Sequence, residues 1–386
     1  MVGVLIVVLA TICAVVWFYL IVARGGFWLG PVRDTATPKP PVRWPAVAVV
    51  VPARNEVGLI AASVRSLLVQ DYPGPFSVIV VDDDSSDGTA AAAMGAAAAD
   101  PDRSLSVVTG HGPPAGWTGK LWALKQGIDA AEASKPDYLL LTDADIVHAP
   151  DTLAWLTAQA SAGGYGLTSL MAKLRCESLA ERSHVPAFIY FFQMLFPFAW
   201  VCRRDSVTAA AAGGCMLVRA DALARIGGIA SIRNSLIDDC ALAARMKADG
   251  PIWVGLTERV RSIRPYDTLS DVRQMISRSA YVQLRYSPVL LIAVAVGMAI
   301  TFLAPPLLAL FAVGWPQYLG LAAWLAMAAS FLPMLRFYRL SPLWAIALPA
   351  IALLYLVYTF DSAYRHLRRR GGQWKGRVHI DAPSLQ

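Results

Sequence analysis

The sequence predicts an α/β domain with a mostly parallel sheet, carried between membrane-spanning helices at the two ends of the chain. Two observations support this prediction. First, hydrophobic residues make up 56% of the 386 residues and charged residues only 16%, and the apolar excess lies at both ends, which indicates membrane segments around a soluble middle. Second, short apolar runs alternate with helical patterns in that middle, as expected for right-handed crossovers between parallel strands.

The first membrane segment is an uncharged run over residues 4–23, long enough to cross a hydrocarbon core of ~30 Å. Because it lacks a basic region before it and an A-x-A cleavage site, we expect an anchor and not a cleaved signal. Basic residues follow it and place the middle of the chain in the cytoplasm by the positive-inside rule. The proline-rich residues 31–45 are typical of a stiff linker.

From residue 46 onward the pattern becomes that of a nucleotide-binding half of a doubly wound fold. Apolar runs predict strands over 46–51, 76–81, 105–109, 137–141 and 165–173. Helical spacing of apolar residues predicts helices over 57–70, 89–99 and 119–134. Neither G-x-G-x-x-G nor a Walker A sequence is present, so dinucleotide binding and ATP hydrolysis lose their main support.

Two carboxylates, Asp143 and Asp145, directly follow the strand over 137–141. Ligands usually bind at the carboxyl ends of strands in an open α/β sheet. Hard oxygen donors at that position suit Mg²⁺ or Mn²⁺, which share a substrate's phosphates. Taken alone, the D-x-D pattern is equally compatible with a solvated turn before the helix that follows Pro150.

The strand over 76–81 runs into Asp82, Asp83, Asp84 and Asp87. Carboxylates this close together repel one another by up to ~1 kcal/mol per exposed pair, which poorly serves a purely structural role. They can accept hydrogen bonds from a nucleobase N–H or from ribose hydroxyls. Asp87 is equally suited to be the N-cap of the next helix.

The net charge is +7, and the positive-inside rule accounts for it better than nucleic-acid binding does, because no nucleic-acid motif is present. The five cysteines have no C-x-x-C spacing and their number is odd. We therefore expect neither a disulfide framework nor a zinc site, and a reduced compartment for the middle domain. The five histidines show no ligand spacing.

Later in the chain, Gly213 and Gly214 predict a tight turn into a strand, where a backbone can approach a ligand closely. Asp238 and Asp239 open a helix, and capping by the helix dipole alone could explain them. The aromatic stretch 187–201 is too short to span a membrane. A core helix is one interpretation, and we favour an interfacial helix that delivers a lipid acceptor.

A helix is expected over 268–286, with Arg278 and Arg285 among its polar residues. Three apolar segments then follow, over 288–313, 316–335 and 342–360, and Pro305-Pro306 and Pro349 predict kinks in them. If all three cross, the basic tail lies outside, against the positive-inside rule. Either one segment is re-entrant or interfacial, or the tail breaks the rule. The basic residues of the tail are Arg365, Arg368, Arg369, Arg370, Lys375 and Arg377.

Several of these motifs, in this order, resemble those of family 2 glycosyltransferases with the GT-A fold. They are residues 51–56 (VPARNE), 80–89 (VVDDDSSDGT), Gly119-Lys120, Asp143-Ala144-Asp145, Gly213-Gly214-Cys215 and 237–239 (IDD). Residues 116–120 (GWTGK) and the terminal membrane helices resemble more narrowly the hopanoid-biosynthesis-associated (hopene-associated) members. Asp84 stands where the family usually has glycine, which tolerates a positive φ more readily.

The resemblance implies a membrane-anchored, inverting glycosyltransferase that moves a sugar from a nucleotide-diphosphate sugar, UDP-linked, to a lipid acceptor such as a hopanoid. It also implies a multi-pass protein of the inner (cytoplasmic) membrane. The corresponding division of the chain is an anchor (1–24), a linker (25–45), a cytoplasmic GT-A domain (46–286), transmembrane segments (287–361) and a basic tail (362–386). The alternatives are a processive polysaccharide synthase and a non-catalytic membrane module that senses a nucleotide or lipid.

The family's roles carry over by position. Asp82 and Asp83 would hold the uracil or ribose, with Glu56 and Lys120 bordering the same pocket. Mg²⁺ or Mn²⁺ on Asp143 and Asp145 would bridge the diphosphate. Asp239 would be the general base, with Asp238 in contact with the acceptor. The family's Q-x-x-R-W motif is degenerate here, so Arg278 or Arg285 would contact the leaving diphosphate, or both are interfacial arginines facing lipid phosphates.

Overall fold

The computed structural model describes residues 2–97, 104–368, 373–374 and 377–378. Two compact units are present. The sheet unit consists mainly of Val32–Arg175 and Trp200–Pro265, and the helical unit of Met1–Pro31, Cys176–Ala199 and Tyr266–Gly372. Each unit is built from segments that are far apart in the sequence. We describe each unit by itself.

The sheet unit contains an eight-stranded sheet in the order β3-β2-β1-β4-β7-β6-β8-β5. Strands β3, β2, β1 and β4 pair in parallel, as do β6 and β8, whereas β7 is antiparallel to both β4 and β6 and β5 is antiparallel to β8. The predicted α/β fold with a mostly parallel sheet is thus confirmed. The strands are β1 (Val47–Ala53), β2 (Phe76–Asp82), β3 (Leu105–Thr109), β4 (Tyr138–Thr142), β5 (Ile146–His148), β6 (Leu167–Lys173), β7 (Cys215–Arg219) and β8 (Ile252–Ser262).

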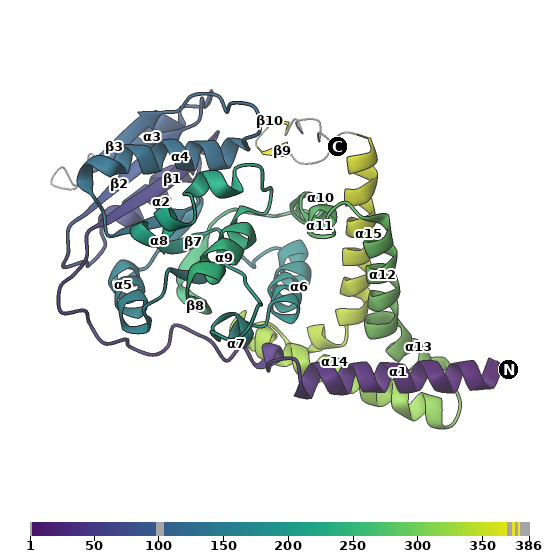
Figure 1. Cartoon of the computed structure of the whole chain (residues 1–386). Coiled ribbons are helices and arrows are strands. Elements are labelled where there is room, and N and C mark those ends of the chain that lie inside the picture. Colours follow the sequence, from purple (N-terminus) through teal and green to yellow (C-terminus); the bar gives the residue numbers. More distant parts are fainter. Residues whose placement is uncertain (1, 98–103, 369–372, 375–376, 379–386) are drawn as a thin grey trace. The chain divides into compact units, whose positions relative to one another are not determined.

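Helices cover both faces of this sheet (Figure 1). On one face, alternate residues of β1 such as Val49 and Val51 pack in one core cluster with Ile60 of α2 and Ala93 of α3. On the other face, α4 lies so close that a Cβ built on Gly127 would be 2.4 Å from Val50 Cγ1. The helices of this unit are α2 (Ile60–Leu68), α3 (Thr89–Ala97), α4 (Gly119–Ala131), α5 (Thr152–Gly163), α8 (Ala220–Arg225) and α9 (Asp238–Asp249), with 3₁₀ turns at Glu132–Ser134 and Ile229–Ile232.

Part of the segment predicted to be a linker is docked on the sheet. Arg33 forms a bridge with Leu256 of β8, and the Asp34 carboxylate lies 3.0 Å from Arg259 Nη1. Trp155 Nε1 donates a hydrogen bond of 2.8 Å to the carbonyl of Ala36. These contacts are specific and partly buried, so residues 33–36 belong to the fold of the sheet unit.

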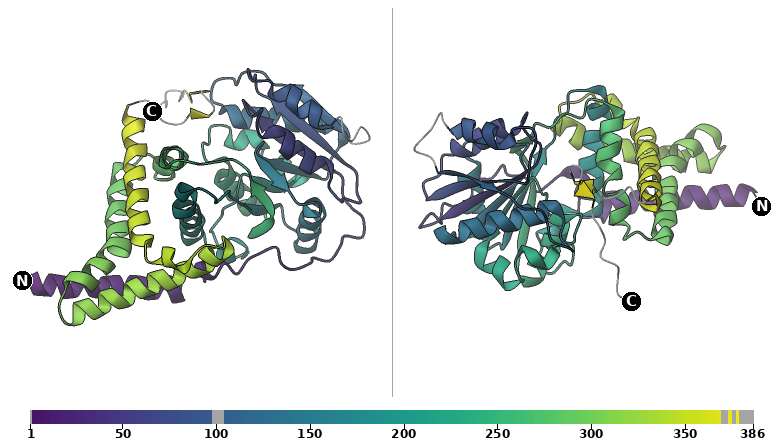
Figure 2. Two further views of the ribbon diagram at one scale, coloured as in Figure 1. Left: turned by 180° about the vertical axis from the view of Figure 1, so that it is seen from behind. Right: turned by 90° about the horizontal axis from the view of Figure 1, so that it is seen from above.

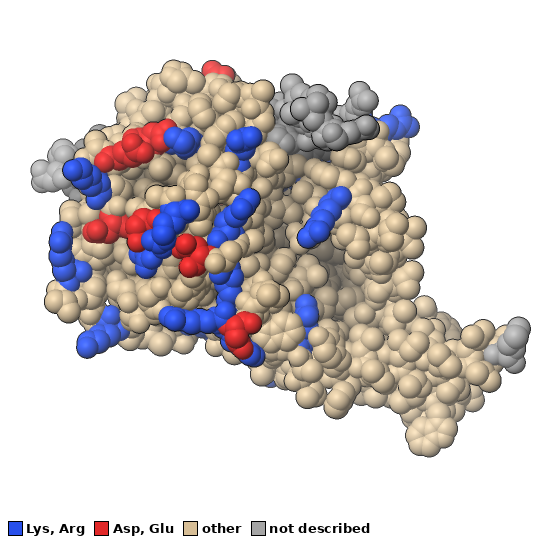
Figure 3. Space-filling view, in the orientation of Figure 1, with Lys and Arg blue, Asp and Glu red and all other residues tan. Residues whose placement is uncertain are grey.

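The helical unit contains three helices that are long and apolar enough to cross a membrane, within the part of the chain that the structure describes. They are Val2–Val22, Pro288–Phe311 and Trp315–Phe337, and the surface over α1 and α13 carries no charged side chain in Figure 3. The predicted third C-terminal segment, 342–360, is not among them. The elements are α1 (Val2–Val22), a 3₁₀ turn (Phe27–Leu29), α12 (Pro288–Met298), a π-helix (Ala299–Leu303), α13 (Ala304–Phe311), α14 (Trp315–Phe337), a 3₁₀ turn (Pro342–Ala345) and α15 (Leu348–Leu367).

Helices α1 and α14 lie side by side and run in the same direction (Figures 1 and 2). The second candidate span is interrupted by its π-helix just before Pro305-Pro306, where a kink is predicted. Pro305 has no N–H to donate to the carbonyl of Thr301, and Trp17 Nε1 of α1 donates to that carbonyl at 2.7 Å instead. The carbonyl that the helix break leaves without an intrahelical donor is therefore used in a hydrogen bond between two helices.

Two predicted helices of this unit have different bounds in the structure. Helix α6 covers Leu179–Leu195, not 187–201, because Ser178 and Glu181 form a capping box at its start and Pro197 follows its end. The helix predicted over 268–286 is divided into α10 (Leu269–Ser277) and α11 (Ala280–Gln283). After α11, Arg285 and Tyr286 both have positive φ, which no helix allows.

Short elements complete the chain. Helix α7 covers Phe198–Val201, and β9 (Gln373–Trp374) pairs antiparallel with β10 (Arg377–Val378). Residues Arg369, Arg370 and Lys375 of the predicted basic tail lie outside the described residues, as do residues 98–99 of the helix predicted over 89–99.

Candidate active site

The predicted site residues of the sheet unit lie near the carboxyl ends of strands β2, β1 and β4. Strands β2, β1 and β4 are parallel neighbours, so the segments that follow them meet at their carboxyl ends. These segments carry Asp83, Glu56 and Asp143. Strand β7 is antiparallel to β4, with Cys215 opposite Thr142, and the two glycines before β7 therefore lie at the same edge.

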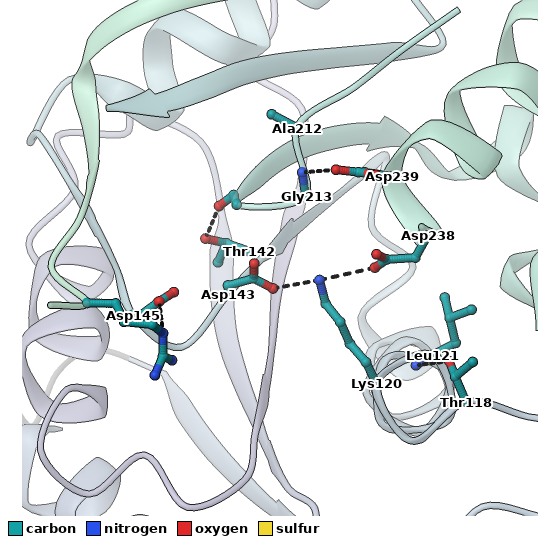
Figure 4. A network of polar contacts seen from close by, with 12 residues as sticks. Thr118, Lys120, Leu121, Thr142, Asp143, Asp145, Ala212, Gly213, Asp238 and Asp239 are labelled. Carbon is teal, nitrogen blue, oxygen red and sulfur yellow. Dashed lines mark hydrogen bonds and ion pairs between the residues drawn. The ribbon is translucent and has the colours of Figure 1, made fainter. Parts of the chain in front are cut away.

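Lys120, at the start of α4, joins two of these carboxylates. Its Nζ lies 2.8 Å from Asp143 Oδ1 and 3.1 Å from Asp238 Oδ2, so it connects the turn after β4 to the start of α9 (Figure 4). Burial alone would lower the pKa of Lys120, but Asp143 and Asp238 outweigh it and raise that pKa. The ammonium group therefore stays charged in the site.

Asp239 occupies a partly exposed position beside this ion pair. Its Oδ2 accepts a hydrogen bond of 3.0 Å from the backbone N–H of Gly213, and its Oδ1 accepts one of 2.7 Å from Cys240 N–H. Burial, reinforced by the neighbouring Asp238, raises the pKa of Asp239 to about 6. The carboxyl group is therefore mostly ionised at neutral pH, and its pKa lies only about one unit below that pH.

Gly213 approaches both charged groups closely. A Cβ built on this glycine would lie 3.4 Å from Asp239 Oδ2 and 3.4 Å from Lys120 Nζ. The next glycine, Gly214, accepts a hydrogen bond of 2.7 Å from Thr142 Oγ1. The predicted close approach of this backbone to a ligand stays a prediction. Burial raises the pKa of the following Cys215 to about 12, which is typical of a packed thiol.

Asp145 has a different cationic partner from Asp143. Its Oδ2 lies 2.6 Å from Nε of Arg264, and Nη2 of the same arginine lies 2.5 Å from Glu56 Oε1. Both carboxylates are largely buried. Sequence analysis missed Arg264, because it belongs to no motif and its partners lie 119 and 208 residues away along the chain.

The carboxylates after β2 are held by the segment after β1. Arg54 Nη1 lies 3.8 Å from Asp83 Oδ2 and donates hydrogen bonds to the carbonyls of Asp83 and Asp84. Asp84 adopts the left-handed conformation with φ 56°, so the loop keeps the geometry that glycine usually provides. Asp82 Oδ1 accepts a 3.3 Å hydrogen bond from the N–H of Ser85. Asp87 accepts from Thr89 N–H at the start of α3, which is the capping alternative.

A divalent metal fits this region by its donor chemistry. Within the described ranges, no cluster of three or more His, Cys, Asp or Glu side chains is already arranged around one point for a metal. Asp143 and Asp145 point in different directions in Figure 4. Carboxylate oxygens are nevertheless concentrated here, since Asp143 and Asp238 contact Lys120 while Glu56 and Asp145 contact Arg264. Burial raises the pKa of Asp143, and the nearby Asp145 adds to the effect. Hard oxygen donors of this kind suit Mg²⁺ or Mn²⁺.

Arg278 belongs to the helical unit. It is exposed, and its N–H donates to the carbonyl of Gln274 at the end of α10. Its predicted contact with the diphosphate stays a prediction, as does that of Arg285.

The α/β sheet with helices on both faces is a GT-A-like fold, and comparison with known proteins identifies the class of protein. Residues 45–279 match the profile of the family described as "Glycosyltransferase like family 2". The match covers more than half of the chain, which therefore belongs to this glycosyltransferase family. The comparison with curated proteins finds no match.

One solved structure has a similar fold over almost the whole chain. The mannosyltransferase PcManGT from Pyrobaculum calidifontis, in complex with GDP-Man and Mn²⁺, has a TM-score of 0.55 and 20% sequence identity. The match covers 93% of this chain and 99% of that one. Glucosyl-3-phosphoglycerate synthase from M. tuberculosis matches with a TM-score of 0.36 and 20% identity, over 60% of this chain and 78% of that one. At these identities the likeness concerns the fold.

Proposed function

We propose that this protein is a membrane-anchored, metal-dependent, inverting glycosyltransferase that transfers a sugar from a nucleotide-diphosphate sugar to a lipid. The observation that carries the proposal is the bridge made by Lys120 between Asp143 and Asp238. It brings the proposed diphosphate end of the site next to the proposed base, as a displacement reaction requires. GDP-Man and Mn²⁺ in the mannosyltransferase of similar fold support a nucleotide sugar and a divalent ion.

The nucleotide-sugar donor would bind along the carboxyl ends of the strands. Asp82 and Asp83 would accept hydrogen bonds from the base and ribose of a nucleotide, UDP-linked in our hypothesis. Glu56 and Lys120 would border the same pocket, and Lys120 contributes a permanent positive charge. Asp143 and Asp145 would hold Mg²⁺ or Mn²⁺, which when bound supplies compensation for charge on the diphosphate. Arg278, or Arg285, would contact the diphosphate.

The acceptor side centres on Asp239. Its ionised carboxylate takes the proton from an acceptor hydroxyl, with Asp238 in contact with the same acceptor. The acceptor oxygen forms a bond to the anomeric carbon as the bond from that carbon to the diphosphate breaks on the opposite face. The configuration therefore inverts, and the electron pair leaves with the nucleotide diphosphate. General-base assistance of this kind contributes ~10²–10⁴-fold to the rate.

A lipid acceptor is supported by the membrane character of the chain. Three described helices are apolar and long enough to cross a bilayer, and α6 with its aromatic residues connects β6 to the segment before β7. An acceptor dissolved in the membrane would suit such an enzyme. The hopanoid in our hypothesis rests on the resemblance of residues 116–120 and the terminal helices.

The test of Asp239 is its replacement by asparagine. Asp239→Asn should lower turnover by ~10²–10⁴-fold and leave binding of the nucleotide sugar nearly unchanged. Asp249→Asn is a matched control, because Asp249 ends the same helix and pairs with Arg225 on the surface. Full turnover by Asp239→Asn would remove Asp239 as the base.

The acceptor is found by mass spectrometry of lipids from cells with and without this protein. The expected difference is one lipid class that gains the mass of a single sugar. A ladder of masses, or a long radiolabelled product, would instead support the processive polysaccharide synthase. The absence of any sugar-bearing lipid would contradict the proposed acceptor.

A further inference from the structure

Arg264 connects two buried carboxylates that come from different loops. It follows β8 directly, and its fork contacts Asp145 at 2.6 Å through Nε and Glu56 at 2.5 Å through Nη2. The backbone is held there as well, because the N–H of Ile263 donates to the carbonyl of Asp145 at 2.9 Å. Side-chain contacts of Arg264 and a backbone hydrogen bond of the preceding residue therefore hold the arginine beside the D-x-D turn.

The two carboxylates of the proposed metal pair are consequently held by two different cations. Lys120 holds Asp143, and Arg264 holds Asp145, with 12% of the Asp145 side chain exposed. Asp143 is directed towards Lys120 in Figure 4, and Asp145 lies on the other side of the turn. The guanidinium group is planar and always charged, so it gives Asp145 charge-assisted hydrogen bonds over the whole accessible pH range.

A metal on Asp145 would have to share that carboxylate with Arg264 or replace it. Sharing places a divalent cation next to a guanidinium group, which like-charge repulsion opposes in a partly buried site. A nucleotide diphosphate changes the balance, because its oxygens offer new anionic partners to both the metal and the arginine.

We propose that Arg264 is a positioning residue that competes with the divalent metal for Asp145, so that the metal binds tightly only together with a nucleotide diphosphate. The proposal rests on the proposed metal role of Asp143 and Asp145. In the free enzyme the guanidinium group takes the place of the ion at Asp145. When the diphosphate arrives, Arg264 exchanges the carboxylate for phosphate oxygens and Asp145 becomes available to the metal.

A purely structural role predicts different behaviour. If Arg264 only ties the end of β8 to the turn after β4, its removal lowers stability and weakens every ligand. Competition predicts instead that removal of the guanidinium group strengthens metal binding in the absence of nucleotide. The two roles are therefore separated by the direction of one change in affinity.

The experiment uses the full chain in detergent and measures free Mn²⁺ by electron paramagnetic resonance during a titration. Titrations are made without nucleotide, with UDP and with GDP, each beside a protein-free control. For Arg264→Gln we expect Mn²⁺ without nucleotide to bind about tenfold more tightly than to the unchanged protein, and the gain from nucleotide to shrink by a similar factor. This is the size expected when one charge-assisted contact no longer competes.

Two further variants complete the design. Arg259→Gln is the matched control, since Arg259 lies in β8, five residues before Arg264, but pairs with Asp34 and Asp151. Its Mn²⁺ affinity should equal that of the unchanged protein. Arg264→Lys keeps the charge but cannot contact both carboxylates in a fork, so its affinity should fall between those of Arg264→Gln and the unchanged protein. It also serves if Arg264→Gln fails to fold.

Unchanged or weaker Mn²⁺ binding by Arg264→Gln without nucleotide, in a protein that melts normally, would overturn the competition. Asp145→Asn distinguishes this failure from that of the proposed function. If the unchanged protein binds Mn²⁺ in the presence of nucleotide and Asp145→Asn does not, the metal role stands and only the inference about Arg264 is wrong. If Asp145→Asn binds Mn²⁺ as well as the unchanged protein under all conditions, both are wrong.

Discussion

Burial of Asp239 links the proposed reaction to pH. The pKa of this carboxyl is raised to about 6 by desolvation and by Asp238. Below that pH the group is protonated and cannot accept the proton of an acceptor, so kcat/KM should fall about tenfold per pH unit as the pH drops below 6. We expect a plateau above pH 7. A profile measured from pH 5 to 8 that stays flat would contradict Asp239 as the base.

The raised pKa of Asp239 also affects stability, and stability changes with pH in the opposite direction to the proposed activity. Because the folded pKa lies above the ordinary value of 3.8, the folded state binds more protons than the unfolded state between these pH values, and stability falls as pH rises through this window. At pH 7 the ionised Asp239 opposes folding. Asp239→Asn should therefore melt at the same temperature as the unchanged protein or higher, so a loss of activity in this variant is not a loss of fold.

Gly213 provides a second test at the level of one residue. A methyl group there would touch both Asp239 Oδ2 and Lys120 Nζ at 3.4 Å, and would fill the space beside the base. We expect Gly213→Ala to lower kcat/KM by roughly tenfold, about the effect of a small misplacement of reacting groups, with little change in melting temperature. Gly250→Ala is the control, because a Cβ at this extended residue would meet nothing within 4 Å. Equal activity of the two variants would contradict the proposed site.

At the residue level, the site could be predicted where motifs lie at strand ends. Lys120, Asp143 and Asp238 come together as their order along the chain suggests. Arg264 could not be predicted, since an arginine before a proline is common and only the fold brings it to Asp145 and Glu56. The family resemblance raised a question at Asp84, and the structure answers it, because this aspartate adopts the left-handed φ.

Among the elements, the first half of the sheet was the easiest to predict. Strands β1 to β4 are apolar and parallel, β1 and β4 are fully buried, and a helix lies between each strand and the next along the chain. The second half was harder. Strand β8 carries Glu258, Arg259 and Arg261 and lies partly at the sheet surface, and β5 has only three residues. The break after α11 was not predicted, because left-handed φ values at Arg285 and Tyr286 leave no signal in these residue types.

The packing of α4 against the sheet gives a prediction at the level of elements. A Cβ on Gly127 would lie 2.4 Å from Val50 Cγ1 and 2.9 Å from Val81 Cγ2, and both valines are stiff, fully buried strand residues. Gly127→Ala should therefore destabilise the protein by ~1–3 kcal/mol, despite the higher helix propensity of alanine. The measurement is the apparent melting temperature in detergent, where each kcal/mol corresponds to ~2–4 °C for a unit of this size.

Gly95→Ala is the matched control for this prediction. Gly95 lies inside α3, and a Cβ there would meet nothing within 4 Å. Alanine should then act only through propensity and raise stability by ~0.5–1 kcal/mol. Opposite shifts in the two variants identify close helix–sheet packing. A stabilising effect of Gly127→Ala would show that α4 has room to move away from β1.

At the scale of the whole molecule, the described helices bear on which side of the membrane the basic tail lies. Sequence analysis found that three C-terminal crossings would place the tail outside. Only 288–311 and 315–337 of these segments qualify as spans, whereas α15 carries Asp361 and Arg365, which pair with each other at 2.9 Å. Ser277 of α10 also donates to Asp361. We propose on these grounds that α15 lies at the membrane surface and does not cross.

An orientation follows that agrees with the positive-inside rule. If α1 ends on the cytoplasmic side, the chain leaves that side through 288–311 and returns through α14, so α1 and α14 cross in the same direction. Their parallel arrangement in the helical unit agrees with this (Figures 1 and 2). In this proposed orientation Arg24, Arg336, Arg339 and Arg368 all lie on the cytoplasmic side.

Reporter fusions to the full chain test this orientation. Alkaline phosphatase, which is active only outside the cytoplasm, should be active when inserted at Gly314 between α13 and α14, and inactive when fused after residue 386. Green fluorescent protein should fluoresce at the second position, because it matures in the cytoplasm and not after export. A fusion after Ser341 is the control that lies between α14 and α15 and should behave like the tail. If the tail fusion is active and the Ser341 fusion is not, α15 crosses the membrane, and the positive-inside rule fails for this tail.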